Sequence, residues 1–186
     1  VVKAQYGYEV ENTIGGAASN EETMMQIGAK GKIGPVALGV GYMMDSRPGA
    51  AEDTSGIRVG AKATFGGFDI AALYQAVSDI AGTAGNDQDA YGLGVGFKFG
   101  NNYVKAQYYI ADDLGVTASS GASQLSVGYD YLFSKTTKAY VTYAQMENDG
   151  GTTFYALGGN GHGSTATSNV TGGSSSVFSA GMIIDF

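Results

Sequence analysis

Apolar residues alternate with small, polar or charged residues along most of the chain. Between Ile57 and Phe65 every second residue is apolar, and the residues between them are Arg, Gly, Lys and Thr. Side chains of a strand point in turn to its two faces, so this period of two predicts a strand with one apolar face. The same pattern predicts ten strands, at residues 1–10, 22–32, 36–45, 55–65, 68–79, 89–99, 103–112, 122–133, 137–147 and 175–186.

The connections between these strands alternate in length. Short turns are expected at 33–35, 66–67, 100–102 and 134–136, and long loops at 11–21, 46–54, 80–88, 113–121 and 148–174. Most strands are close to the ~9–11 residues that a tilted strand needs to cross a bilayer. This organisation predicts an all-β, transmembrane, antiparallel up-and-down β-barrel. Residues 1–186 then form a single barrel domain with both termini periplasmic, and 148–174 is the longest extracellular loop.

Composition narrows the class of protein further. The chain has 31 Gly and 13 Tyr but only 2 Pro, which favours strands over helices, and no apolar stretch reaches the ~18–20 residues of a membrane-spanning helix. The absence of Cys removes disulfides and Cys-based metal sites. A net charge of −7 disfavours a nucleic-acid partner, which would require a basic surface.

Aromatic residues on the apolar faces fall near the strand ends. Such residues anchor transmembrane barrels at the two membrane interfaces, so membrane lipid is an expected partner. The alternative is that Tyr and Phe simply favour strands. The expected girdle beside the short turns is Phe65, Phe68, Phe99, Tyr103, Tyr131 and Phe133, and the expected ring near the long loops is Tyr42, Tyr74 and Tyr108.

Charged residues occupy the opposite faces of the strands. The candidate pore-lining residues are Lys3, Lys30, Lys32, Arg58, Lys62, Lys98, Lys105 and Asp130, joined by Lys138. Most of these lysines lie towards the short turns, whereas most acids lie in the long loops, so a basic belt and an acidic rim are expected. Like charges in a pore select ions, and these two levels favour opposite signs, which leaves the net selectivity open. The alternative is that these charges only keep the wall hydrated.

Neither cofactors nor metal ions are expected, because the acids form no compact set of ligands. Glycines on the charged faces, including Gly39, Gly92 and Gly96, leave room for an inward-folded loop or ease the curvature of the barrel.

Two segments resemble known outer-membrane proteins. Phe178, Met182, Ile184 and Phe186 share one face of the last segment, which ends in Phe. This resembles the C-terminal strand of outer-membrane barrels, which implies that the four residues form the signal read by the barrel assembly machinery. Residues 128–140, Gly-Tyr-Asp-Tyr-Leu-Phe-Ser-Lys-Thr-Thr-Lys-Ala-Tyr, resemble the strand, turn and strand before the last loop of general Gram-negative porins.

The resemblance implies a function, a larger assembly, and outer-membrane lipid and lipopolysaccharide as partners, with divalent cations that could bridge the acidic rim to lipopolysaccharide. General porins are sixteen-stranded homotrimers in the bacterial outer membrane, through which small hydrophilic solutes and ions diffuse passively. With ten strands, this chain is expected to be the C-terminal portion of such a porin, without the constriction loop. A self-contained ten-stranded barrel is the alternative.

Two other functions compete with transport. A non-conducting adhesin or receptor would act through the long loops, where a phage or surface ligand could also bind a porin. A ten-stranded, protease-like enzyme would need a nucleophile and a base in fixed geometry. The only histidine, His162, lies in the Gly-rich loop 148–174, which is a poor place to hold them. We therefore predict no catalytic residue and no enzymatic activity.

Overall fold

The computed structural model describes residues 2–11, 20–47, 49–150 and 172–185, and it is almost entirely β-structure. The strands are β1 (Val2–Glu11), β2 (Asn20–Ile33), β3 (Val36–Ser46), β4 (Thr54–Phe65), β5 (Phe68–Ser78), β6 (Gln88–Phe99), β7 (Asn102–Ala111), β8 (Ala122–Leu132), β9 (Thr137–Asn148) and β10 (Ser174–Ile184). All ten predicted strands are confirmed, with ends that differ by two residues at most. A short 3₁₀ helix, η1 (Ile80–Gly82), was not predicted.

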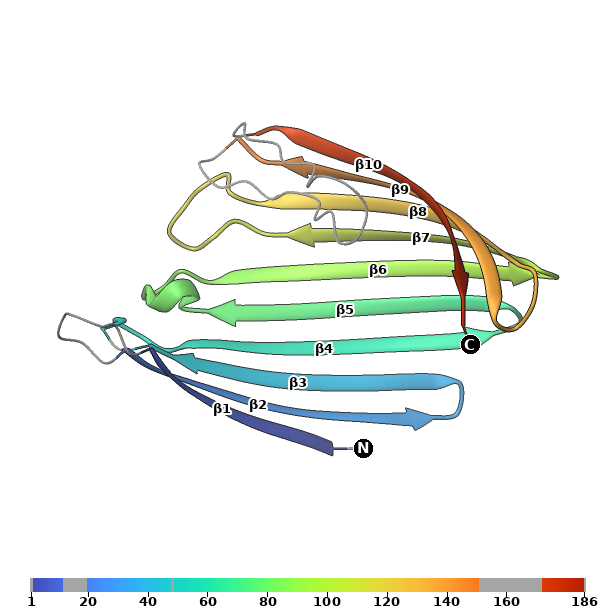
Figure 1. The fold of residues 1–186 in the computed structure, drawn as a ribbon. Coiled ribbons are helices and arrows are strands. Elements are labelled where there is room, and N and C mark those ends of the chain that lie inside the picture. The colour runs from blue at the N-terminus through green and yellow to red at the C-terminus, as the bar shows by residue number, and fades with distance from the viewer. Residues whose placement is uncertain (1, 12–19, 48, 151–171, 186) are drawn as a thin grey trace.

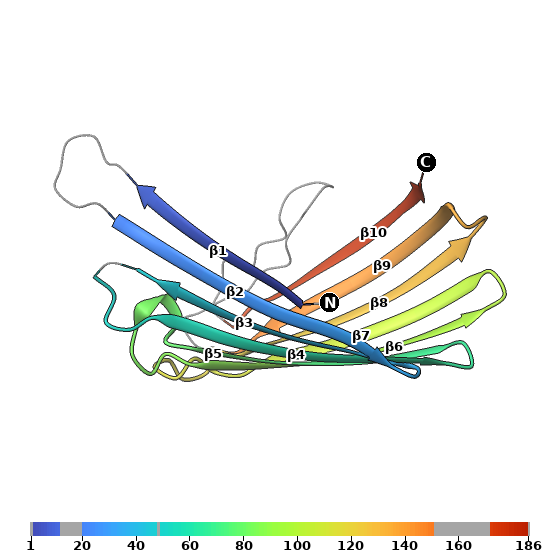
Figure 2. The same cartoon turned by 90° about the horizontal axis from the view of Figure 1, so that it is seen from below.

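Each strand pairs antiparallel with its neighbours in the chain, in the order β1 to β10 (Figure 1). β1 and β10 stand on the same side of the middle strands, so the sheet is curved like a trough (Figure 2). Within the described residues β1 and β10 do not pair with each other, and the sheet is open. The up-and-down topology is confirmed, whereas closure into a barrel is not seen in this chain.

Tight turns connect the strands at one end of the sheet. Gly66 and Gly67 join β4 to β5 and have φ values of 56° and 85°. A two-residue hairpin turn of this kind requires positive φ at both positions, which glycine adopts without steric cost. A side chain at Gly67 would also place its Cβ 2.7 Å from the carbonyl oxygen of Lys98. These glycines therefore fix the length of the turn.

The two faces of the sheet differ in character. Residues paired directly across strands share a face, and Leu93 is paired with Ala72 on one side and Tyr108 on the other. This convex face carries large exposed apolar side chains, with Leu93 65% and Phe178 70% exposed. Of the described hydrophobic residues only Ala144 is buried. A surface with so much exposed apolar area and so little core needs an apolar environment.

The other face is concave and is lined by small, polar and charged residues. It contains an open hollow of roughly 760 Å³, bounded in part by Lys30, Lys62, Gly92 and Gln107. Within the described ranges, no helix has the length and apolar character needed to span a membrane.

Candidate functional site

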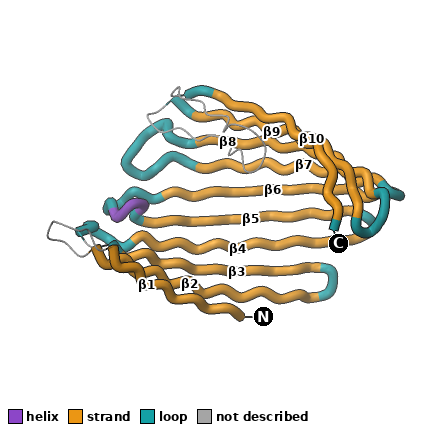
Figure 3. Tube along the Cα trace, viewed as in Figure 1, coloured by secondary structure: helices purple, strands orange, loops and turns teal. Residues whose placement is uncertain are grey.

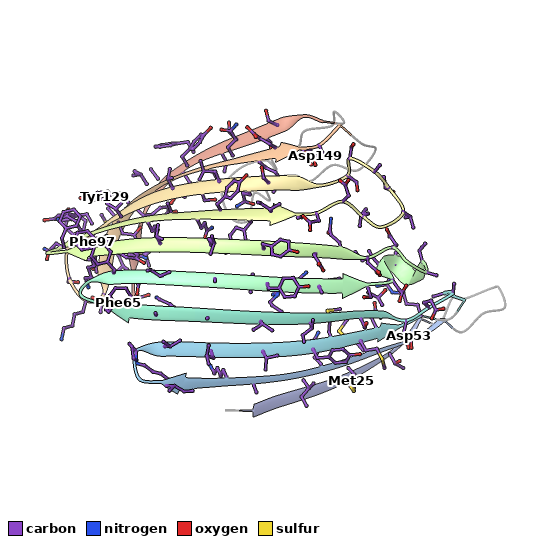
Figure 4. The ribbon with its side chains drawn as sticks, turned by 180° about the vertical axis from the view of Figure 1, so that it is seen from behind. Met25, Asp53, Phe65, Phe97, Tyr129 and Asp149 are labelled. Carbon is purple, nitrogen blue, oxygen red and sulfur yellow. The ribbon has the colours of Figure 1, made fainter. Side chains whose placement is uncertain are left out.

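Aromatic side chains gather on the convex face beside the short turns. Phe68 stacks on Phe97 with ring centroids 4.3 Å apart, and Phe97 lies 5.5 Å from Phe99. Phe65 is 6.5 Å from Phe68. Figure 4 shows Phe65, Phe97 and Tyr129 at this end of the sheet. The predicted girdle did not include Phe97 or Tyr129, although their alternation with Phe99 and Tyr131 places them on the same face.

The prediction that Tyr103 belongs to this girdle is wrong. Tyr103 is paired with Lys98 and lies on the concave face, where its hydroxyl donates to Asp69 Oδ2 at 2.9 Å. The predicted turn 100–102 is too long by one residue. Because Phe99 pairs with Asn102, the residue that shares its face is Asn102, and Tyr103 points to the other side.

Tyrosines on the convex face also lie towards the long loops. Tyr42, Tyr74 and Tyr108 are exposed there, at 38%, 38% and 45%. The rings of Tyr74 and Tyr91 are 5.4 Å apart, and both hydroxyls donate to Asp89 Oδ2, at 3.2 and 3.4 Å. Asp89 thus holds two neighbouring tyrosines, of which Tyr91 was not part of the predicted ring.

The cross-strand register places the candidate pore-lining residues together on the concave face. Lys32 and Lys62 both pair with Ala37. Lys98 pairs with Tyr103, which pairs in turn with Asp130. The same alternation puts Lys30, Arg58 and Lys105 on this face. Lys3 is opposite Gly28 in β1, and its side chain lies outside the described part of the structure.

Three of the lysines on this face are held by two carboxylates. Lys62 Nζ is 3.3 Å from Asp69 Oδ1, whereas Lys105 and Lys138 share Asp130 at 2.8 and 3.2 Å. The Asp130 side chain is only 5% exposed. Asp69 was not among the predicted pore-lining residues, even though it alternates with the convex residues Phe68 and Ile70.

Tyr103 connects these two groups of ion pairs. Its hydroxyl donates to Asp69, and Lys105 Nζ lies 5.7 Å from its ring centroid. We call this set of six side chains the wall network; it consists of Lys62, Asp69, Tyr103, Lys105, Asp130 and Lys138. It links strands from β4 to β9 near the short turns.

Arg58 differs from the lysines of the wall network because its partner is neutral. Its Nε donates to Gln75 Oε1 at 2.7 Å, and a second guanidinium nitrogen donates to the same oxygen. The hydrogen bonds orient the guanidinium group without cancelling its charge.

Glycines on the concave face fall into two groups. The ring of Tyr103 covers Gly96, and Lys105 lies over Gly128, where its Cε would be 2.9 Å from an added Cβ. By contrast, nothing but a backbone oxygen at 3.9 Å would meet a Cβ at Gly39. Some glycines therefore make room for neighbouring side chains, and others leave the wall bare.

The described parts of the long loops at the other end are joined through their backbones. We call this set of residues the rim; it consists of residues 46–47, 49–53, 79–87, 112–121 and Asp149. Ala51 N–H donates to Gly82 O at 3.1 Å, and Gly115 N–H donates to Asp87 O at 2.8 Å. Asp149 N–H donates to Gly121 O at 2.9 Å. Figure 3 shows these loops and the short helix η1 at one end of the strands.

Carboxylates hold the individual loops of the rim in shape. Asp113 accepts the backbone N–H groups of Ser119 and Gly121, at 2.9 and 2.8 Å, and these bonds lower its pKa. Asp79 accepts from Gly85 N–H at 2.8 Å. Some acids of the predicted acidic rim are thus structural. In the described ranges, no three His, Cys, Asp or Glu side chains meet in a group that could hold a metal ion.

The last strand presents Phe178, Met182 and Ile184 on the convex face, all exposed. Phe186 and His162 lie outside the described residues, as does most of the predicted loop 148–174.

A family model for Gram-negative porins matches residues 1–151. The chain belongs to the Gram-negative porin family. The family implies a location in the bacterial outer membrane, where the exposed apolar residues of this porin-family chain would face lipid.

One solved structure that resembles the chain is that of a porin refined at 1.8 Å resolution. The TM-score is 0.59 at 19% sequence identity, a level of likeness that shows the fold alone. The match covers 78% of this chain and 52% of the solved porin, so the chain spans about half of that protein. No curated protein sequence showed significant similarity.

Proposed function

We propose that the chain forms part of the wall of a water-filled outer-membrane channel, through which small hydrophilic solutes and ions diffuse passively. The observation that carries this proposal is the division of the sheet into a convex face of exposed apolar residues and a concave face of charged residues and glycine. A lipid-exposed barrel with an aqueous lumen requires this division. Lys30, Lys32, Arg58, Lys62, Lys98, Lys105 and Asp130 would then line the lumen, as would Lys3.

The open edges of the sheet support a larger barrel. In a bilayer the unpaired backbone groups of β1 and β10 must find partners, because no water is present to hydrogen-bond them. We propose that about six further strands complete a sixteen-stranded barrel, in which both ends of the present chain are periplasmic. The homotrimer follows from the resemblance to general porins.

We propose that the aromatic residues of the convex face anchor the chain at the two membrane interfaces. The cluster around Phe68 and Phe97 would mark the periplasmic interface, and the pair Tyr74 and Tyr91 the outer one, next to lipopolysaccharide. Phe178, Met182, Ile184 and Phe186 would form the assembly signal read by the barrel assembly machinery.

A planar bilayer experiment tests the channel directly. The full-length protein, extracted from its native membrane and reconstituted at low density, should give discrete, ohmic current steps in symmetric KCl. Intact mass measured on the same sample gives the length of the whole chain. Folded protein that inserts into the bilayer and passes no current would contradict the channel proposal.

The rim favours a second role as a receptor for a phage or another surface ligand. Because its loops are joined by backbone hydrogen bonds, the rim offers a defined surface and not a set of independent loops. Replacement of residues 112–121 by a short turn should abolish ligand adsorption to whole cells while leaving conductance intact. No contact among the described residues favours a catalytic role.

A further inference from the structure

Alternation along the strands does not distinguish the lysines of the concave face, but the structure separates five of them into two classes. Lys62, Lys105 and Lys138 belong to the wall network and lie 2.8–3.3 Å from a carboxylate. Lys32 and Lys98 form no ion pair with any described residue. Both classes lie at the end of the sheet where the short turns are.

The two classes differ in the charge that a passing ion would meet. The wall network holds three lysines against two aspartates and therefore carries a net charge of +1, whereas Lys32 and Lys98 together carry +2. The field of a paired charge also falls off faster with distance than that of a single charge. With a screening length of about 8 Å at physiological ionic strength, little of the field of a closed ion pair reaches the middle of a lumen.

The geometry of the wall network indicates a structural role for its lysines. Asp130 is nearly buried and lies between Lys105 of β7 and Lys138 of β9, so its two ion pairs join three consecutive strands. Asp69 receives both Lys62 and the Tyr103 hydroxyl. These contacts fix the lysines against the wall.

We propose that Lys32 and Lys98 are the residues that determine selectivity for small anions at the short-turn end of the lumen, and that Asp69 and Asp130 mask all but one of the three lysine charges of the wall network. The inference rests on the channel proposed above. The solutes concerned are small inorganic anions and small carboxylates.

The test compares the removal of unmasked charge with the removal of a whole ion pair. The full-length protein is reconstituted in planar bilayers under a KCl gradient, and the permeability ratio of chloride to potassium is obtained from the reversal potential. Lys32→Gln with Lys98→Gln should lower this ratio by about twofold, as Coulomb's law with ionic screening gives for two wall charges about 8 Å from a permeating ion. Lys62→Gln with Asp69→Asn also replaces two side chains, but it should leave the ratio unchanged.

Two further variants keep the test decisive if the second double variant does not fold. Exchange of the pair, Lys62→Asp with Asp69→Lys, retains an ion pair and should also leave the ratio unchanged. Asp130→Asn exposes Lys105 and Lys138 and should raise the ratio. Heat-modifiable migration in SDS gels shows which variants are folded.

The outcomes separate this inference from the channel proposal. Equal falls in the ratio for the Lys32/Lys98 and the Lys62/Asp69 variants, in a protein that conducts, would overturn the inference alone. Absence of current in the unaltered protein would overturn both.

Discussion

The two ends of the sheet are held together in different ways. At the short-turn end, side chains make the connections: the wall network crosses the concave face and stacked aromatic rings cover the convex face. At the long-loop end, the rim is joined mainly by backbone hydrogen bonds, and aspartates hold backbone N–H groups. The difference shows that contacts at one end depend on side-chain identity, while those at the other depend on loop conformation.

The largest effect is expected where a glycine makes room for the wall network. Gly96→Val would force its Cβ into the ring and hydroxyl of Tyr103, which would displace the bond to Asp69. Overpacking of this kind costs about 1–3 kcal/mol of the free energy of unfolding. Urea unfolding of the full-length protein in lipid vesicles measures the change.

Gly39→Val is the matched control, because Gly39 lies on the same face with an open Cβ direction. It should change the free energy of unfolding by less than about 0.5 kcal/mol. Equal destabilisation by both variants would contradict the packing role of Gly96.

A smaller effect is expected from Asp130→Asn, which leaves Lys105 and Lys138 close together without a carboxylate. The lysines remain 38% and 37% exposed, so solvent screening reduces the cost to about 1–2 kcal/mol. Lys98→Gln removes a charge outside the network and should leave urea unfolding unchanged. If the two variants were equally stable, the network would have no role in joining the strands.

The smallest effect is expected for the rim loop that Asp113 holds, and its stability should depend on pH. The backbone N–H groups of Ser119 and Gly121 lower the pKa of Asp113, so its contribution to loop stability is present above the ordinary carboxyl pKa of about 3.9. It is lost as the pH falls through the lowered value in the folded protein. Hydrogen-exchange protection factors of these two amides should therefore drop in acid.

Asp113→Asn should reduce this protection at neutral pH and remove most of its pH dependence. Asp112→Asn is the matched control, because among the described residues the Asp112 carboxylate forms no hydrogen bond and no ion pair, and this variant should behave like the unaltered protein. Protection that is independent of pH in the unaltered protein would show that backbone contacts alone hold the loop.

Tyr103 shows where prediction from the alternation of residues succeeded and where it failed. Strict alternation from Tyr108, which is correctly placed on the convex face, already puts Tyr103 on the concave one. The prediction was wrong because the turn after Phe99 was expected to be one residue longer than it is. One extra residue in a turn reverses the predicted face of every residue in the strand that follows. Asp69 was missed for a different reason. Alternation places it on the concave face, but the sequence contains no signal for its partners on β4 and β7.

The ten strands, the two faces of the sheet and the alternation of short and long connections could all be predicted from the sequence. These depend on a period of two residues and on local turn residues, both of which are local properties of the chain. The folded sheet was needed to show which lysines are paired, which glycines are covered and which loops are joined. Those contacts depend on the register and curvature of strands far apart in the chain, and on side-chain directions that no local pattern encodes.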